Sequence, residues 1–261
     1  MDQLRRSLCV CLAGLGLAHA AWAADPKTIT VGVENLAFQP HYGTQNGDYT
    51  GYFRDLMDAF AKREGLKVIY KPMDIDDLYA AFFKGQVDFK YPDDAAWRAD
   101  ARKGLKVTYS KPSVGYVDGT LKLASNKNLT ADKIKVLGKP AGFFTPPYSS
   151  AIEAGLKVME FNSTQELVEA LRSGKVEAIY HNVDVALYYA RTAKIKDVVF
   201  APDLPMIQSD YRLSSFKRPE IIQKFDDFVA KEKDFCDKLR DRYNIDAARR
   251  LTTMKIFQHK G

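Results

Sequence analysis

Residues 76–91 and residues 165–180 are two copies of one pattern, and this repeat constrains the fold more than any other feature of the sequence. The copies align without gaps, and five positions are identical, including Gly85 with Gly174. In each copy apolar residues recur at helical spacing, a glycine follows, and a short β-strand pattern begins at once. Helix–glycine–strand units are common in α/β proteins, so a coincidental likeness is one interpretation. The other is a protein built from two related lobes.

The region before the first copy has the order strand, helix, strand. Residues 29–33 are a β-branched run, which ends in a loop that contains Pro40. Apolar residues over 53–65 recur at helical spacing up to a glycine, and residues 67–73 again have a strand pattern. This order predicts a parallel sheet with a crossover helix, and therefore an α/β fold.

Turn-forming residues mark two further places in the chain. They are concentrated over residues 110–119 and 201–205, between and after the two copies of the repeat. We expect the chain to cross between lobes there. After the second crossing, residues 218–243 have the spacing of one or two helices, which return the chain to the first lobe. The expected architecture is two α/β lobes joined by two hinge crossings, with lobe 1 at residues 24–113 plus 206–261 and lobe 2 at residues 114–205.

The N-terminus has the features of a secretory signal peptide. Two arginines precede an apolar run over residues 8–22, and the cleavage-site triplet Ala-Trp-Ala occupies residues 21–23. The run is shorter than the roughly 20 residues that a membrane-spanning helix needs. We expect residues 1–23 to be cleaved off near Ala23, leaving a periplasmic chain without membrane insertion. Of the three cysteines only Cys236 lies beyond this segment, so no intramolecular disulfide is expected.

The composition argues against several classes of partner. Lys and Arg outnumber Asp and Glu by 39 to 33, for a net charge of +6, but the basic residues are interspersed with acids. We therefore expect a solvated surface and no nucleic-acid partner. Beyond the signal, His41, His181 and His259 are scattered and a single cysteine remains, so no metal-ligand pattern is present. Phosphate-binding Gly-Lys-Ser/Thr patterns are absent too. We expect no metal and no cofactor.

Several short motifs follow one another in a particular order. They are Gly-Tyr-Phe-Arg-Asp-Leu at 51–56, Val-Asp at 87–88, Tyr-Ser-Lys-Pro at 109–112 and Gly-Lys-Pro-Ala-Gly at 138–142. In this order and spacing they resemble the family 3 extracellular solute-binding proteins of amino-acid ABC importers. The resemblance implies a type II periplasmic binding protein fold with the ligand in the cleft between the lobes. It also implies a monomer that hands a small polar amino-acid-like or carboxylate solute to an inner-membrane ABC permease, a separate chain.

The resemblance places part of the binding site in the loop after the first strand. Family members have an aromatic residue there against the ligand, and this chain offers Phe38 and Tyr42, with Glu34 upstream. An aromatic face suits an apolar or cationic group. Phe38 could equally pack the loop, so Tyr42, with its polar tip, is the stronger candidate.

The family's carboxylate-binding motif is altered in this chain. Members that bind α-amino acids usually carry Thr-x-x-Arg after the lobe 1 strand, and the arginine forks onto the α-carboxylate. This chain instead has Tyr91, Asp93, Trp97 and Arg98 in the corresponding stretch, followed by Arg102. We expect all five to be candidates for ligand binding. Either Arg98 or Arg102 would hold a carboxylate, and a surface role for both stays open.

Two more departures fall in lobe 2. A loop with two prolines replaces the family's Gly-Thr-Thr loop, and in it Thr145 keeps a hydroxyl while Tyr148 adds an aromatic ring. Asn182 stands where the family has the aspartate that pairs with the ligand's ammonium. Asparagine brings no charge, and an unpaired ion in a closed cleft costs about 3–5 kcal/mol. The ligand is therefore expected to lack a free ammonium, unless Asp184 or Asp93 replaces the lost charge.

Two other functions stay open on the sequence alone. Cyclohexadienyl dehydratases resemble these binding proteins, and a fold does not fix a function. An enzyme would need a general acid or base in the cleft, for which Glu177, His181 and Asp93 are the candidates. We expect no catalytic residue, because no paired carboxylate or nucleophile stands at a recognisable spacing. The third possibility is an adaptor that presents its closed form to a membrane receptor.

Overall fold

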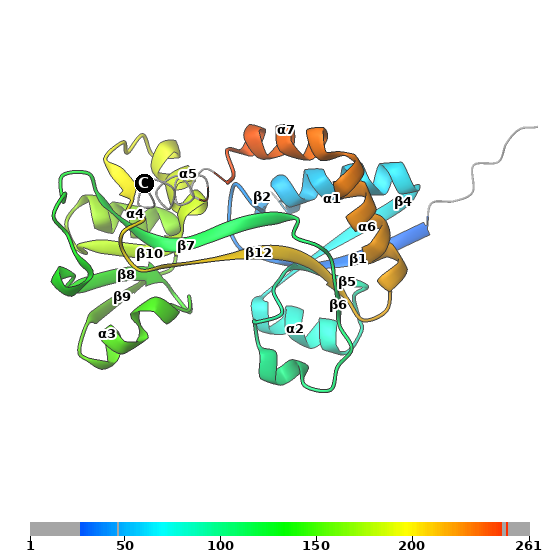
Figure 1. Ribbon diagram of the computed structural model, residues 1–261, viewed down its shortest axis with the longest axis horizontal. Coiled ribbons are helices and arrows are strands. Elements are labelled where there is room, and N and C mark those ends of the chain that lie inside the picture. The colour runs from blue at the N-terminus through cyan, green and yellow to red at the C-terminus, as the bar shows by residue number, and fades with distance from the viewer. Residues whose placement is uncertain (1–26, 46, 247–248, 250–261) are drawn as a thin grey trace, which may run out of the picture.

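The computed structural model describes residues 27–45, 47–246 and 249, which form two lobes connected by a pair of long strands (Figure 1). The predicted signal peptide, residues 1–23, and His259 lie outside these described residues. None of the helices described is long and apolar enough to cross a membrane. The predicted architecture of two α/β lobes is confirmed.

Lobe 1 is built on the strand–helix–strand unit that the sequence predicted. Its strands are β1 (Lys27–Glu34), β2 (Gly43–Gln45), β3 (Asp48–Thr50), β4 (Leu66–Met73), β5 (Phe89–Asp93) and β6 (Thr108–Tyr109). Its helices are α1 (Tyr52–Glu64), α2 (Ile75–Phe83), the short 3-10 helix η1 (Ala99–Arg102), α6 (Pro219–Lys231) and α7 (Lys233–Tyr243). β4, β1 and β5 pair in parallel in this order. α7 packs against α1 and α6, so the chain returns to lobe 1 as expected (Figure 1).

Lobe 2 repeats the same plan on a smaller scale. Its strands are β8 (Val136–Pro140), β9 (Lys157–Phe161), β10 (Ala178–Asn182) and β11 (Val198–Phe200). Its helices are the 3-10 helices η2 (Ala131–Lys133) and η3 (Pro146–Tyr148), then α3 (Ser149–Glu153), α4 (Thr164–Arg172) and α5 (Val183–Thr192). β10, β8 and β9 are parallel neighbours.

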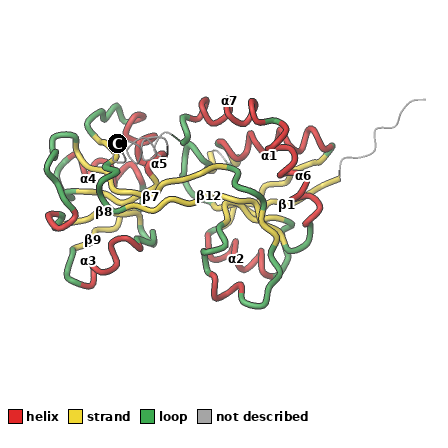
Figure 2. Tube along the Cα trace, viewed as in Figure 1, coloured by secondary structure: helices red, strands yellow, loops and turns green. Residues whose placement is uncertain are grey.

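Two long antiparallel strands, β7 (Val114–Leu123) and β12 (Met206–Ser215), run between the lobes (Figure 2). β12 pairs with β5 of lobe 1 and β7 pairs with β10 of lobe 2, so one ten-stranded sheet passes through both lobes. The prediction of a turn at Asp118 and Gly119 is wrong, because both residues lie inside β7. A Cβ atom at Gly119 would meet the Phe200 ring at 2.7 Å, so glycine here permits close packing. The residue-level lobe boundaries stay a prediction, since both lobes share these strands.

The two copies of the repeat occupy equivalent places in the two lobes. The first copy forms α2 and β5 and the second forms α4 and β10, and each of these two strands pairs with a crossing strand. The shared glycines, Gly85 and Gly174, both have left-handed φ values, 66° and 74°, which end each helix without steric cost. The second helix has an N-terminal cap, because the Ser163 hydroxyl accepts a hydrogen bond from the Glu166 amide at 3.2 Å. The interpretation of two related lobes is therefore supported.

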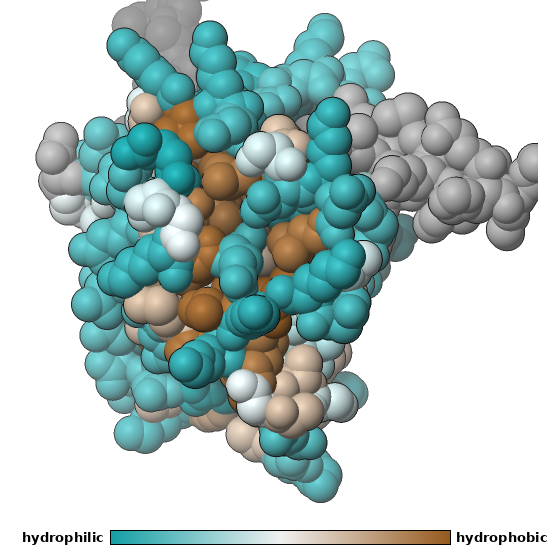
Figure 3. Space-filling view, turned by 90° about the vertical axis from the view of Figure 1, so that its left-hand side faces the viewer, coloured by the Kyte–Doolittle hydropathy of each residue, from teal (hydrophilic) through white to brown (hydrophobic). Residues whose placement is uncertain are grey.

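Each lobe has its own hydrophobic core. In lobe 1 the helices α1 and α6 meet through Phe60 and Phe225, whose rings pack edge to face with centroids 5.3 Å apart. In lobe 2, Leu167 and Leu171 of α4 cover Ile179 of β10. Seen from the free end of lobe 2, the surface is mainly hydrophilic, with a narrow apolar band between charged residues (Figure 3). This matches the solvated surface that the charge pattern predicted.

Candidate functional site

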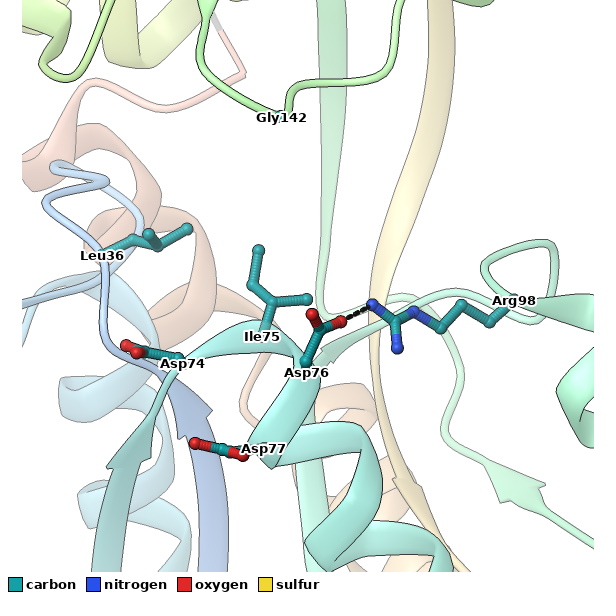
Figure 4. Close-up of a pocket in the computed structure, with 7 residues that line it drawn as sticks. All are labelled: Leu36, Asp74, Ile75, Asp76, Asp77, Arg98 and Gly142. Carbon is teal, nitrogen blue, oxygen red and sulfur yellow. Dashed lines mark hydrogen bonds and ion pairs between the residues drawn. The ribbon is translucent and has the colours of Figure 1, made fainter.

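The mouth of the cleft between the lobes is a pocket of about 500 Å³, large enough for a small solute (Figure 4). Both lobes line it, with Leu36, Asp74, Ile75, Asp76, Asp77 and Arg98 from lobe 1 and Gly142 from lobe 2. Leu36 and Ile75 point toward the loop that carries Gly142 (Figure 4). The rim of lobe 1 therefore presents apolar side chains to lobe 2, beside three carboxylates and one guanidinium.

Arg98 is the predicted carboxylate ligand that lies in this pocket. It has a left-handed backbone, with φ 49°, and its guanidinium is 4.3 Å from the centre of the Tyr79 ring. It forms an ion pair with Asp76, and both side chains are exposed, at 42% and 88%. An exposed pair of this kind contributes only about 0–1 kcal/mol. Exchange of Asp76 for the carboxylate of a ligand would therefore cost little.

Arg102, the other candidate, is already occupied inside lobe 1. Its two terminal nitrogens donate to the two oxygens of Asp93, at 2.6 and 3.1 Å. Asp93 is fully buried and also accepts from Lys90 at 3.3 Å and from Ser214 at 2.5 Å. Bidentate pairing of this kind is strong and geometrically specific. That either side chain contacts a ligand stays a prediction, because in this structure they bind each other.

The three candidates in and before the loop after β1 contact one another. The Tyr42 hydroxyl donates to Glu34 at 2.5 Å, and the Phe38 ring stacks on the Tyr42 ring with centroids 5.0 Å apart. Burial raises the pKa of Glu34, and the nearby Lys90 ammonium lowers it in part. All three side chains are buried, and a contact with ligand stays a prediction for each of them. The loop thus offers an acidic group backed by stacked rings.

A row of aromatic side chains continues from this loop along the crossing strands. Tyr211 is at its centre, with its ring stacked on Tyr116 at 4.3 Å. The rings of Trp97, Tyr91 and His41 lie around Tyr211 at 6.0, 6.2 and 5.4 Å. Tyr91 and Trp97 were candidates from the sequence. Tyr116, Tyr211 and His41 were not, although they complete the wall at the back of the cleft.

The candidates of lobe 2 lie in two different places. Asn182 begins α5, where its side chain accepts from the Val185 amide at 3.1 Å and donates to the Tyr211 hydroxyl at 3.3 Å. It therefore lies at the back of the cleft. Tyr148 packs in the core of lobe 2, with its hydroxyl bonded to Thr120 at 2.7 Å, and Thr145 is buried just before it. A contact of Tyr148 or Thr145 with ligand stays a prediction.

The lobes touch each other at the back of the cleft. The edge of the His181 ring in lobe 2 meets the Phe38 ring at 5.6 Å. The Tyr189 hydroxyl of α5 donates to the carbonyl of Ala37 at 3.1 Å. These contacts link the end of β10 and the helix α5 to the loop that carries Phe38. The two lobes are therefore in direct contact beside the cleft through these two residue pairs.

The side chains considered for acid–base chemistry have structural contacts. Glu177 accepts hydrogen bonds from two backbone amides, of Lys135 and Val136, each at 2.7 Å. Burial lowers the pKa of His181 to about 3, and its ring bonds to Thr164 at 3.0 Å. The third candidate, the carboxylate of Asp93, is held by the guanidinium described above. No group of three or more His, Cys, Asp or Glu residues that could hold a metal occurs in the part of the chain that the structure describes.

Comparisons with known proteins agree with this geometry. A relative from Campylobacter jejuni, named "Probable histidine-binding protein", is 24% identical over 216 residues, which cover 80% of this chain and 82% of the relative. Among solved structures, an ancestral arginine-binding protein bound to arginine has a TM-score of 0.64 and 25% identity, with 84% of this chain and 99% of that chain covered. An ancestral amino-acid-binding protein, described as a precursor of cyclohexadienyl dehydratase, has a TM-score of 0.61 and 25% identity, with coverage of 83% and 95%.

The family itself is shown by a match over most of the chain. The model of the bacterial extracellular solute-binding proteins, family 3, matches residues 29–234. This range includes both lobes and both crossing strands, so the predicted family and the type II binding-protein fold are confirmed. The chain belongs to the family 3 extracellular solute-binding proteins.

Proposed function

We propose that this protein captures a small amino-acid-like solute in the inter-lobe cleft and delivers it to an ABC permease, a separate chain in the inner membrane. The main observation behind this proposal is that residues of both lobes line the pocket at the mouth of the cleft, and that two long strands connect the lobes. A ligand that contacts both walls favours the closed form, which a permease can recognise. The histidine- and arginine-binding likenesses support an amino-acid-like ligand. We also propose a periplasmic location and a monomer.

We infer further that the protein binds its solute without changing it. Glu177 is used in backbone hydrogen bonds, Asp93 is paired with Arg102, and the pKa of His181 lies far below neutrality. Incubation of the protein with prephenate or arogenate tests this inference. We expect no phenylpyruvate or phenylalanine above the uncatalysed rate, and product formation that depends on the protein would contradict it.

Ligand binding should raise the melting temperature of the mature chain, residues 24–261. A ligand at 100 times its Kd stabilises the folded state by about 2.7 kcal/mol, which corresponds to roughly 5–10 °C for a chain of this size. The probes are the twenty protein amino acids, L-cystine and a set of small organic acids, read by differential scanning fluorimetry. An increase with one or a few related compounds is expected. The absence of any increase across the whole set would contradict the proposed function.

Substitution of Arg98 should weaken the binding of a carboxylate without affecting stability. In Arg98→Gln the side chain stays polar, but it loses the charged guanidinium that can donate two parallel hydrogen bonds to a carboxylate. Affinity for the best amino-acid probe should therefore fall about 10- to 100-fold. The free energy of unfolding should change by less than about 0.5 kcal/mol, because the side chain is exposed. Isothermal titration calorimetry and urea unfolding measure the two effects. Unchanged affinity would exclude Arg98 as the carboxylate ligand.

A further inference from the structure

Asp118 is an acidic residue at the back of the cleft that none of the sequence motifs pointed to. It lies in the crossing strand β7, directly opposite Asn182 of β10 and Ile207 of β12 in the register of the sheet. Its Oδ1 atom is shielded from solvent and has no hydrogen-bond partner among the described residues. A buried acceptor without a donor is rare in native structures, so a specific explanation is needed.

Three tyrosine rings surround this carboxylate. Tyr116 comes two residues before Asp118 in β7, and Tyr180 comes two residues before Asn182 in β10, so each tyrosine is on the same face of its strand as that residue. The Tyr211 ring stacks on the Tyr116 ring. The charge of Asp118 contributes to raising the pKa of all three hydroxyls, which places it close to each of them. The oxygen of a tyrosine hydroxyl can accept a hydrogen bond from a cationic donor. The surroundings of Asp118 therefore favour a positively charged group.

The protein itself supplies no such group among the described residues. No described lysine or arginine forms an ion pair with Asp118, whereas Asp93 is paired with Arg102 and Lys90. Asp184, the other residue considered as a source of charge, contacts the His41 ring at 3.8 Å. A cation that pairs with Asp118 therefore has to come from outside the described residues.

We propose that Asp118 binds the ammonium group of the solute, with Tyr116, Tyr180 and Tyr211 around it. The inference rests on the proposed function and names the ligand class as amine-bearing. The expectation that the ligand lacks an ammonium was based on Asn182 alone. The register of the sheet puts a carboxylate on the neighbouring strand, opposite Asn182, and this carboxylate can take over the missing charge.

The pH dependence of binding follows from the same contacts. Burial raises the pKa of Asp118 to about 7, and the Asn182 amide lowers it in part. An ammonium binds the ionised carboxylate, so affinity should increase as the pH rises from about 5.5 to 8. Burial raises the pKa of Tyr116, Tyr180 and Tyr211 and lowers that of His41 to about 3, so these neighbours stay neutral over this range. Glu34, which lies beyond Tyr211, also has a raised pKa. A variant at position 118 shows which of the two acids causes the pH dependence of binding.

The test compares Asp118→Asn with the double variant Asp118→Asn, Asn182→Asp, which moves the carboxylate to the residue directly opposite. Asp132→Asn, an exposed change of the same chemistry, is the matched control. The probes are L-arginine, L-histidine, L-glutamine and agmatine, which carry an amine, and glutarate, glutaramate and 2-oxoglutarate, which do not. Calorimetry at pH 5.5 and 8 gives affinities, and circular dichroism checks the fold of every variant.

We expect binding only from the amine-bearing set, with higher affinity at pH 8. Affinity for the strongest probe should fall roughly 30- to 1,000-fold in Asp118→Asn and lose its pH dependence. The double variant should recover most of this loss, and Asp132→Asn should match the parent protein. Undiminished binding in Asp118→Asn, or binding from the amine-free set alone, would overturn the role of Asp118 and leave the proposed function standing. No binding from either set would overturn both.

Discussion

Replacement of Asp93 by asparagine should lower the free energy of unfolding by about 3–5 kcal/mol, because it removes the carboxylate that pairs with two buried cations. Arg102 forks onto this carboxylate at 2.6 and 3.1 Å, and Lys90 lies 3.3 Å away with no solvent exposure. Asparagine has nearly the same shape, so the change removes charge and one acceptor but little packing. Guanidinium unfolding followed by circular dichroism measures the effect.

Asp100→Asn is the matched control for this substitution. Asp100 has an ion pair of the same type, with Lys103 at 2.7 Å, but both side chains are almost fully exposed. Its loss should change the free energy of unfolding by less than about 0.5 kcal/mol. Equal effects of the two substitutions would show that burial of the Asp93 network contributes nothing to stability.

The Asp93 network also holds part of the wall of the cleft. Arg102 donates through Nε to the carbonyl of Trp97 at 2.8 Å, so the pair fixes the segment that brings the Trp97 ring against Tyr211. Asp93→Asn should therefore reduce ligand affinity as well as stability. Arg98 and Arg102 are only four residues apart in the sequence, yet Arg98 pairs with an exposed carboxylate and Arg102 with a buried one.

The fold was largely predictable because its elements have regular periodicity. The repeat over 76–91 and 165–180 predicted a helix, a glycine and a strand in each lobe, and the structure has α2 with β5 and α4 with β10. The strands β1 and β4 and the helix α1 followed from apolar spacing within one or two residues. These signals are local, since each depends on neighbours along a single element.

The residues that the crossing strands bring to the back of the cleft were not predictable, because their positions depend on pairing between distant segments. Asp118 and Gly119 have the composition of a turn, but pairing with β10 and β12 on both sides keeps them in an extended strand. Tyr116 and Tyr211 are far apart in the sequence and meet only through the register of β7 and β12. The pairing register of two distant strands cannot be predicted from the residue pattern of either strand alone. The residue that we infer to bind the ammonium therefore became visible only once the sheet was in place.

Gly51→Ala should be the most damaging single-atom addition near the site, with a loss of about 2–5 kcal/mol in stability from backbone strain and overpacking. Gly51 precedes α1 with φ 105°, and a Cβ there would meet Tyr42 Cα at 2.7 Å and the His41 carbonyl oxygen at 2.9 Å. These are backbone atoms, which cannot rotate away. The loop that carries His41 and Tyr42 would have to move. This movement would disrupt two hydrogen bonds of 3.1 Å, which the amides of Tyr52 and Phe53 donate to carbonyl oxygens of the loop.

Movement of this loop carries Tyr42 and Phe38 out of the wall of the cleft, so affinity for the best probe should fall together with stability. Gly47→Ala separates strain from collision, because Gly47 also has a left-handed φ, of 84°, but no described residue other than its chain neighbours lies within 4 Å of an added Cβ. It should cost only about 1–2 kcal/mol and leave affinity unchanged, as measured by thermal unfolding and calorimetry. If both variants bound ligand as tightly as the parent protein, the prediction would be wrong. The packing of this loop against the start of α1 would then not determine the position of the Tyr42 ring.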